Sequence, residues 1–196
     1  MKSVIPHIAL AAGLAIAASA SATPVKYSLD PTHTQVIATW SHLGFSKPAA
    51  VFVIGNGTLN WDADNPAASS VSVEIALGEL TTTVPALDRR FLGEGYFDVG
   101  KYPVARFEST AVAASDKDGH FTVTGTLTIK DVSKPVTLDA VLNGSHEHPM
   151  RKVPAIGFDA TGTLKRSDFG LDAYPQAVAD EIELRITTEA FATAKE

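Results

Sequence analysis

Apolar and polar side chains alternate strictly in one segment after another of this chain, and this pattern limits the fold more than any other feature. The stretch YFDVGKYPVARFEST, residues 96–110, is typical, because Ala105 and Phe107 fall on one side of an extended chain and Arg106 and Glu108 on the other. A period of two predicts a β-strand with one wet face and one buried face. The buried face can meet a second packed sheet or enclose a space.

Similar segments recur between turn signals and predict about eight antiparallel strands. A glycine-rich kink is expected at Gly55 and Gly57, and a hairpin over residues 120–144 with its turn from Asp131 to Pro135. The strand segments are residues 33–45, 50–62, 70–77, 96–110, 120–144, 155–170 and 178–187.

One segment departs from the alternation and predicts a short helix near residues 85–92. Pro85 suits the first helical turn, Leu87 and Phe91 recur at helical spacing, and Gly93 can end the helix. We expect this helix to lie across the sheet, just before the stretch quoted above.

About eight strands with one apolar face each are compatible with two all-β architectures, a two-sheet sandwich or a closed up-and-down barrel of the lipocalin type. The inward candidates mix large aromatic side chains with small residues. Such a mixture suits a cavity that holds one small ligand, and it equally suits a closely packed core. Periodicity alone leaves both alternatives open.

Residues 1–22 have the features of a secretory signal peptide. Lys2 gives a positive start, an alanine-rich apolar run follows, and small residues up to Ala22 supply a cleavage site. The run is too short and too interrupted for a membrane-spanning helix, which needs about 20 apolar residues. We therefore expect residues 23–196 to form one exported domain, free in the periplasm and without a stable membrane anchor.

The charge of the chain argues against nucleic acid or an anionic membrane surface as a partner. The net charge is −6, and it becomes −7 when Lys2 is removed with residues 1–22. The sequence contains no cysteine, which excludes disulfides and thiol chemistry. The fold must therefore be stabilised by burial, and the sequence is compatible with a monomer or a homodimer.

Four segments in register resemble the YceI-like family of exported, lipocalin-like proteins that bind polyisoprenoids. These segments are residues 29–47, 96–110, 125–138, and 166–171 followed by 179–184. The resemblance implies an extended eight-stranded antiparallel barrel whose apolar lumen holds a polyprenyl chain, such as a polyprenyl phosphate, or an isoprenoid quinone. It implies no required cofactor, and it answers the opening question by placing Phe107 in the lumen.

Closing such a barrel would turn the apolar faces of its strands toward one interior. The expected lumen residues are Val36, Trp40, Phe52, Val73, Ile75, Phe107, Val123, Leu127, Leu138, Phe158 and Leu184. The expected residues at the mouth, near a lipid head group, are His42, Arg90, Phe91, Phe97, Arg166 and Asp168. For Arg166 and Asp168, a paired turn that braces the barrel end is an equal alternative.

The helical segment departs from the family's pattern at the mouth. Many members have Arg-Asp-x-His-Leu here, whereas this chain has Leu87-Asp88-Arg89-Arg90-Phe91. Arg90 thus replaces the usual histidine, which changes the charge where a head group would lie. The apolar tail site is unaffected.

The chain carries no sequence signature of an enzyme. It has no Gly-x-Ser-x-Gly motif, and its aspartates fall at strand ends and turns, where they commonly bond local backbone. His146 and His148 lie two residues apart in a loop, without a third ligand, so we expect no specific metal site. For His33 and His42 a structural role is favoured over head-group contact.

Two functions of different classes follow from the sequence. The first is a carrier for an isoprenoid-type lipid, and the second is a secreted β-sandwich interaction module without a small ligand.

Overall fold

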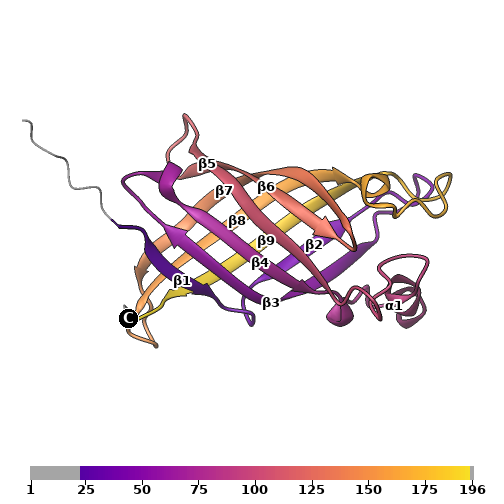
Figure 1. Cartoon of the computed structure of the whole chain (residues 1–196), viewed down its shortest axis with the longest axis horizontal. Helices are drawn as coiled ribbons and strands as arrows, with labels where there is room; N and C mark the ends of the chain where they lie inside the picture. The colour runs from indigo at the N-terminus through magenta and orange to yellow at the C-terminus, as the bar shows by residue number, and fades with distance from the viewer. Residues whose placement is uncertain (1–22, 195–196) are drawn as a thin grey trace, which may run out of the picture.

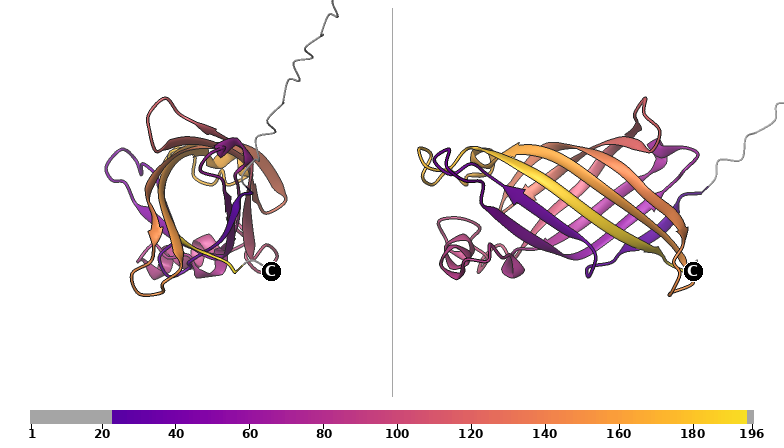
Figure 2. Two further views of the ribbon diagram at one scale, coloured as in Figure 1. Left: turned by 90° about the vertical axis from the view of Figure 1, so that its left-hand side faces the viewer. Right: turned by 180° about the vertical axis from the view of Figure 1, so that it is seen from behind.

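Antiparallel strands form a closed, elongated barrel in the computed structural model, which describes residues 23–194 (Figures 1 and 2). Strands β2 to β9 follow one another around the barrel in chain order, and β9 pairs with β2 to close it. The strands are β1 (Val25–Leu29), β2 (Gln35–Thr39), β3 (Ala49–Trp61), β4 (Ser70–Ala76), β5 (Val104–Ala114), β6 (His120–Ile129), β7 (Val132–Glu147), β8 (Pro154–Lys165) and β9 (Glu181–Ala192). The prediction of an eight-stranded up-and-down barrel is confirmed, and the sandwich alternative is wrong.

Strand β1 is an element that the sequence did not predict. It lies in line with β2, because both pair with β3 and β9: Tyr27 lies opposite Leu59 and Ala192, whereas Gln35 lies opposite Val53. β1 and β2 therefore share one of the eight barrel positions, separated by a turn. Five residues with only two buried side chains give too short an alternation for recognition.

The hairpin between β6 and β7 has a tighter turn than predicted. Ile129 lies directly opposite Val132, so only Lys130 and Asp131 form the turn, and Lys130 has a positive φ of 57°. The expected turn from Asp131 to Pro135 is therefore wrong beyond its first residue. The polar run that suggested a turn is part of strand β7, where Ser133 and Pro135 pair with Thr128 and Thr126.

β-Bulges keep the apolar faces of the long strands directed inward. In β5, Ala105 and Phe107 are buried, the register shifts between Ser109 and Ala111, and Val112 is buried next. One extra residue reverses which side chains point inward, so the bulge restores the inward face to Val112. A similar shift between Ile54 and Asn56 lies at the kink expected at Gly55.

Gly125 on β6 leaves room for the ring of Phe107 on the neighbouring strand. A Cβ atom at Gly125 would lie 2.4 Å from Cζ of Phe107 and 2.6 Å from the carbonyl oxygen of Glu108. Real Cβ atoms do not approach other atoms so closely, and overpacking of this kind destabilises folded proteins. The glycine therefore determines how the Phe107 ring lies against the wall.

Helix α1 (Pro85–Leu92) has the bounds that the sequence predicted, but it lies beyond one end of the barrel and not across the sheet (Figure 1). Pro85 occupies the first turn, and Gly93 follows the last residue. The carboxylate of Asp88 accepts hydrogen bonds of 2.6 Å from the backbone N–H and the hydroxyl of Thr82. These bonds lower the pKa of Asp88 and attach the helix to the segment before it. The shorter 3₁₀ turns are Pro66–Ala68, Leu77–Glu79 and Arg166–Phe169.

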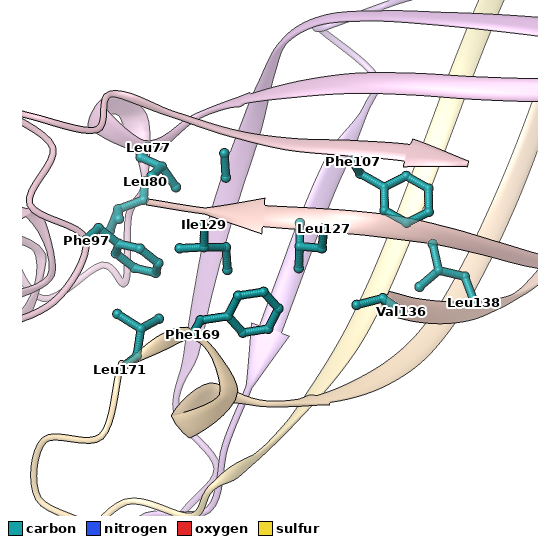
Figure 3. Close-up of a cluster of buried hydrophobic side chains, with 11 residues drawn as sticks. Leu77, Leu80, Phe97, Phe107, Leu127, Ile129, Val136, Leu138, Phe169 and Leu171 are labelled. Atoms are coloured by element: carbon teal, nitrogen blue, oxygen red, sulfur yellow. The ribbon is translucent and has the colours of Figure 1, made fainter. Parts of the chain in front are cut away.

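The buried side chains form two clusters inside the barrel. The larger cluster reaches the α1 end, where Phe97, Ile129, Phe169 and Leu171 converge between the strands and the end loops (Figure 3). The smaller cluster lies toward the other end and includes Tyr27, Ile54, Trp61 and Ile156. The space between and around these clusters is the candidate site.

Candidate functional site: an apolar cavity in the barrel

A cavity of about 570 Å³ occupies the interior of the barrel. This is within the range of about 300–1,000 Å³ that is usual for small-molecule sites. All eleven residues that the sequence placed in the lumen line this cavity, including Phe107 of the alternating stretch at residues 96–110. That these residues bind a ligand stays a prediction.

Aromatic rings close the end of the cavity that lies away from α1. Trp61 of β3, Phe121 of β6 and Phe158 of β8 meet edge to face, with ring centroids 5.0 Å apart for Trp61–Phe121 and 5.3 Å for Trp61–Phe158. These three strands are not neighbours in the barrel, so the rings meet across the lumen. Each of these rings is carried by a strand that is hydrogen-bonded on both sides, so their backbone positions are fixed by the barrel wall.

A second group of aromatic rings lies at the α1 end of the cavity. Some of these rings belong to α1 and to the turn after it, and not to the strands. Phe91 of α1 lies 5.6 Å from Trp40 and 5.0 Å from Tyr96, while Phe97 lies 5.7 Å from Phe52. Phe91 and Phe97 both line the cavity, as the sequence predicted for the mouth. Because α1 and the turn after it lie outside the strand ladders, this end is the mouth of the cavity.

The loop before β9 forms the opposite side of the mouth. Tyr174, Ala177 and Val178 of this loop line the cavity, and the loop bonds to the turn after β2, where the N–H of Leu43 donates to the carbonyl of Ala177 at 2.8 Å. Sequence reasoning missed these residues. The loop has no periodic pattern, and its position depends on contacts with distant segments.

Arg166 holds this loop in place through its side chain. Its guanidinium is buried and donates to the carbonyl oxygens of Ala179 and Val178, at 3.0 and 2.9 Å, and to those of Leu171 and Ala173. Arg166 also lines the cavity.

Asp168 is exposed and does not line the cavity, so its expected place at the mouth is wrong. The proposed Arg166–Asp168 pair is also wrong, because Arg166 bonds carbonyl oxygens instead. The carboxylate of the turn comes from Asp180, which accepts bonds from the N–H and hydroxyl of Ser167 at 2.9 and 2.8 Å. These bonds lower the pKa of Asp180.

His42 and Arg90 line the cavity at its mouth, as predicted. The backbone of His42 pairs with Ser46 and Val178, which places its ring beside the loop before β9. The guanidinium of Arg90 lies over the ring of Tyr174, 5.5 Å from its centroid, in a cation–π contact.

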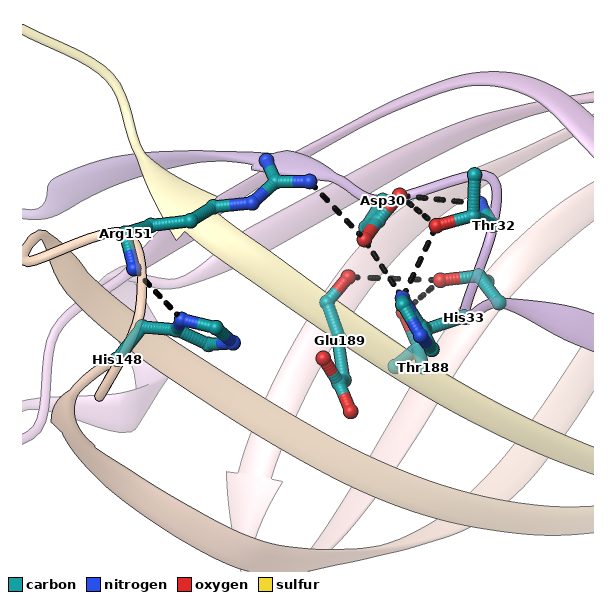
Figure 4. A network of polar contacts seen from close by, with 8 residues as sticks. Asp30, Thr32, His33, His148, Arg151, Thr188 and Glu189 are labelled. Carbon is teal, nitrogen blue, oxygen red and sulfur yellow. Dashed lines mark hydrogen bonds and ion pairs between the residues drawn. The ribbon is translucent and has the colours of Figure 1, made fainter.

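A polar cluster on the barrel wall joins the break between β1 and β2 to the end of β9 (Figure 4). Asp30 is buried and accepts from the N–H and hydroxyl of Thr32 and from Nδ1 of His33, the last at 2.8 Å, while Arg151 lies 3.7 Å away. Burial raises the pKa of Asp30, but the bonds from His33 and Thr32 outweigh it and lower that pKa to about 2. The bond from His33 to Asp30 raises the pKa of His33 in turn.

This cluster also brings Asp30 and His33 close to Glu189, within the spacing that a metal ion needs. The Asp30 oxygens are already bonded and face the guanidinium of Arg151, so the arrangement serves to fasten the broken strand. Nδ1 of His148 accepts from the backbone of Met150 and Arg151, a local structural role.

Within residues 23–194, no helix combines the length and apolar content needed to cross a bilayer.

Comparison with known proteins agrees with the geometry. A family model described as the YceI-like domain matches residues 27–190. The chain belongs to the YceI-like family. A UPF0312 protein of Pseudomonas putida is 36% identical over 183 residues, which cover 92% of this chain and 94% of the relative.

Solved structures share the YceI-like barrel. BcnA of Burkholderia cenocepacia superposes with a TM-score of 0.73 at 22% identity, covering 82% of this chain and 98% of BcnA. A domain from Saccharophagus degradans, described as a polyisoprenoid binding domain, has a TM-score of 0.62 at 16% identity and covers 86% of this chain and 99% of that domain. At these identities the likeness concerns the fold.

Proposed function

We propose that this chain binds a long isoprenoid-type amphiphile, a polyprenyl phosphate or an isoprenoid quinone, and carries it with the tail inside the barrel. The observation that carries the proposal is the cavity itself, which is apolar along its length, closed by rings on strands at one end and bordered by a helix at the other. The description of the S. degradans neighbour as a polyisoprenoid binding domain supports the tail type. The sequence and the cavity give no support for catalysis, and we propose a binding role.

The cavity volume limits the length of tail that it can enclose. At about 30 Å³ for each non-hydrogen atom, the volume that a water molecule occupies in the liquid, 570 Å³ holds about 20 such atoms. This corresponds to about four isoprene units, and a longer tail would widen the barrel or extend from the mouth.

Burial of such a tail supplies enough free energy for tight binding. Several hundred Å² of apolar surface at about 25 cal/mol per Å² gives on the order of 10 kcal/mol before the cost of ordering the tail is subtracted. No charged contact is needed for the tail to bind.

Lipid extraction tests the proposal directly. We expect organic extracts of the purified protein to contain a prenyl lipid by mass spectrometry, or the lipid-free protein to take one up. Phe107→Asp should abolish retention, because an unpaired carboxylate in the lumen is costly. Ala113→Asp, which places the same group on the exposed face of β5, is the matched control and should retain the lipid.

A second variant separates loss of binding from loss of folding. Ala160→Phe fills the lumen with an apolar ring and should lower uptake while the circular dichroism spectrum stays that of the parent. A folded parent that contains no lipid and takes up no prenyl chain would refute the carrier function.

We also propose that the protein works in the periplasm after removal of residues 1–22. The support is the signal-peptide pattern of this segment, which lies outside the described residues. N-terminal sequencing of exported protein should begin near Thr23. A pool that keeps Met1 and stays in the cytoplasm would contradict the proposal.

A further inference from the structure

The charged residues that line the cavity are all of one sign. Among the lining residues, all of which lie in the described part of the chain, Arg90 and Arg166 are the charged side chains, and no aspartate or glutamate is present. This contrasts with the whole chain, in which acidic residues outnumber basic ones by 22 to 16. The positive sign of the cavity is therefore a local feature.

Arg166 brings a buried charge without a carboxylate partner to this lining. Its partners are carbonyl oxygens, and no acidic oxygen of residues 23–194 lies within 4.0 Å of its guanidinium. Carbonyl groups satisfy the hydrogen bonds of the guanidinium but do not neutralise its charge. The carboxylate that interacts with it electrostatically, that of Asp180, is exposed and bonded to Ser167, so it compensates the buried charge only in part, and such a charge is costly. An anion in the cavity would lower this cost.

Arg90 of helix α1 adds a second cation at the mouth, facing the loop before β9 that Arg166 holds. It lies over Tyr174, while Arg166 bonds the carbonyl oxygens of Ala173 and Val178 on either side of that tyrosine. Arg90 likewise has no ion-pair partner among residues 23–194. Its guanidinium can form the forked hydrogen bonds that favour a phosphate or carboxylate group.

We propose that the cavity selects an amphiphile with an oxyanion head group, a phosphate monoester or a carboxylate, over an uncharged isoprenoid quinone or alcohol. The inference rests on the proposed function, because it requires the tail to lie in the cavity. Arg90 binds the head group at the mouth, and Arg166 supplies a fixed positive charge behind it.

Four ligands with the same number of isoprene units in the tail test the selection. These are geranylgeranyl monophosphate, geranylgeranoic acid, geranylgeraniol and a quinone with a four-unit tail. Both tryptophans of the chain, Trp40 and Trp61, line the cavity, so quenching of intrinsic fluorescence reports occupancy for each ligand. We expect at least one anion to bind about tenfold or more tightly than the alcohol and the quinone, and its affinity to fall with added salt.

Neighbouring arginines of the helix provide a matched pair of variants. Arg90→Gln should weaken binding of the anion about tenfold and leave binding of the alcohol unchanged. Arg89→Gln removes the same charge one residue away, from a side chain that does not line the cavity, and should leave both affinities close to those of the parent.

The outcomes separate this inference from the proposed function. Equal affinity for all four ligands, or equal effects of Arg90→Gln and Arg89→Gln, would overturn head-group selection while tail binding stands. Binding of none of the four would remove the proposed function as well.

Discussion

At the scale of single residues, the Asp30–His33 pair makes stability depend on pH. The folded pKa of Asp30 is about 2, below its ordinary value of 3.8, so the carboxylate contributes stability above about pH 4 that is lost as the pH falls toward 2. The contribution is about 2 kcal/mol at neutral pH. The folded pKa of His33 is raised, so its contribution is complete below its ordinary pKa of 6.5 and is lost as the pH rises through the folded value.

Asp30→Asn should therefore lower the free energy of unfolding by about 2 kcal/mol at pH 7, measured by urea denaturation. The difference between variant and parent should shrink as the pH falls from 4 toward 2. Asp116→Asn, at an exposed turn, serves as the control and should change the stability little. A difference that stays constant from pH 7 to pH 2 would show that the charge of Asp30 does not contribute.

The sequence predicted the lumen residues better than the polar residues of the mouth. Inward positions such as Phe107 and Phe158 follow from alternation within a single strand, which is a local property. The partners of Arg166 are carbonyl groups of a loop up to 13 residues away, which no pattern of residue types reveals. Asp168 was misplaced for the same reason, because the turn instead uses Asp180.

At the scale of elements, the sequence predicted the length of helix α1 but neither its position nor the turn between β6 and β7. Pro85 and Gly93 bound the helix in the sequence, so its length was predictable, whereas its place beyond the barrel depends on aromatic contacts between Phe91 and distant residues such as Trp40. The β6–β7 turn was misjudged because polar residues at the start of β7 resemble a loop in the sequence.

The position of α1 predicts that it controls how fast a ligand leaves. Phe91→Ala removes ring contacts with Trp40, Tyr96 and Phe97 without touching any strand pair. We expect the dissociation rate of a bound prenyl lipid to rise several-fold in stopped-flow fluorescence, with little change in the melting temperature. Phe121→Leu, at the closed end, is the comparison, and it should lower the melting temperature more than it changes the dissociation rate. An unchanged rate in Phe91→Ala would place the exit elsewhere.

At the scale of the whole molecule, the first and last strands of the described residues, β1 and β9, meet in one seam. Tyr27 of β1 pairs with Ala192 of β9, and the N–H of Thr193 donates to the carbonyl of Lys26 at 2.9 Å. The pairs of β2 with β9 likewise join segments that are far apart in the sequence, such as Gln35 with Thr187. Pairing over such a separation forms slowly, because the entropic cost of closing a long loop comes before any stabilising contact is made.

This seam gives the fold an order of assembly. The other seven junctions of the barrel join consecutive strands and can form as the chain emerges, but the wall stays open until β9 has been made. A nascent chain therefore has no enclosed space that could hold a lipid. It also lacks the pairing of β9 with β1 and β2 that closes the barrel. Under the export and lipid binding proposed above, such a chain would cross the membrane before its barrel closes, and it would enclose a lipid only in the compartment where it completes its folding.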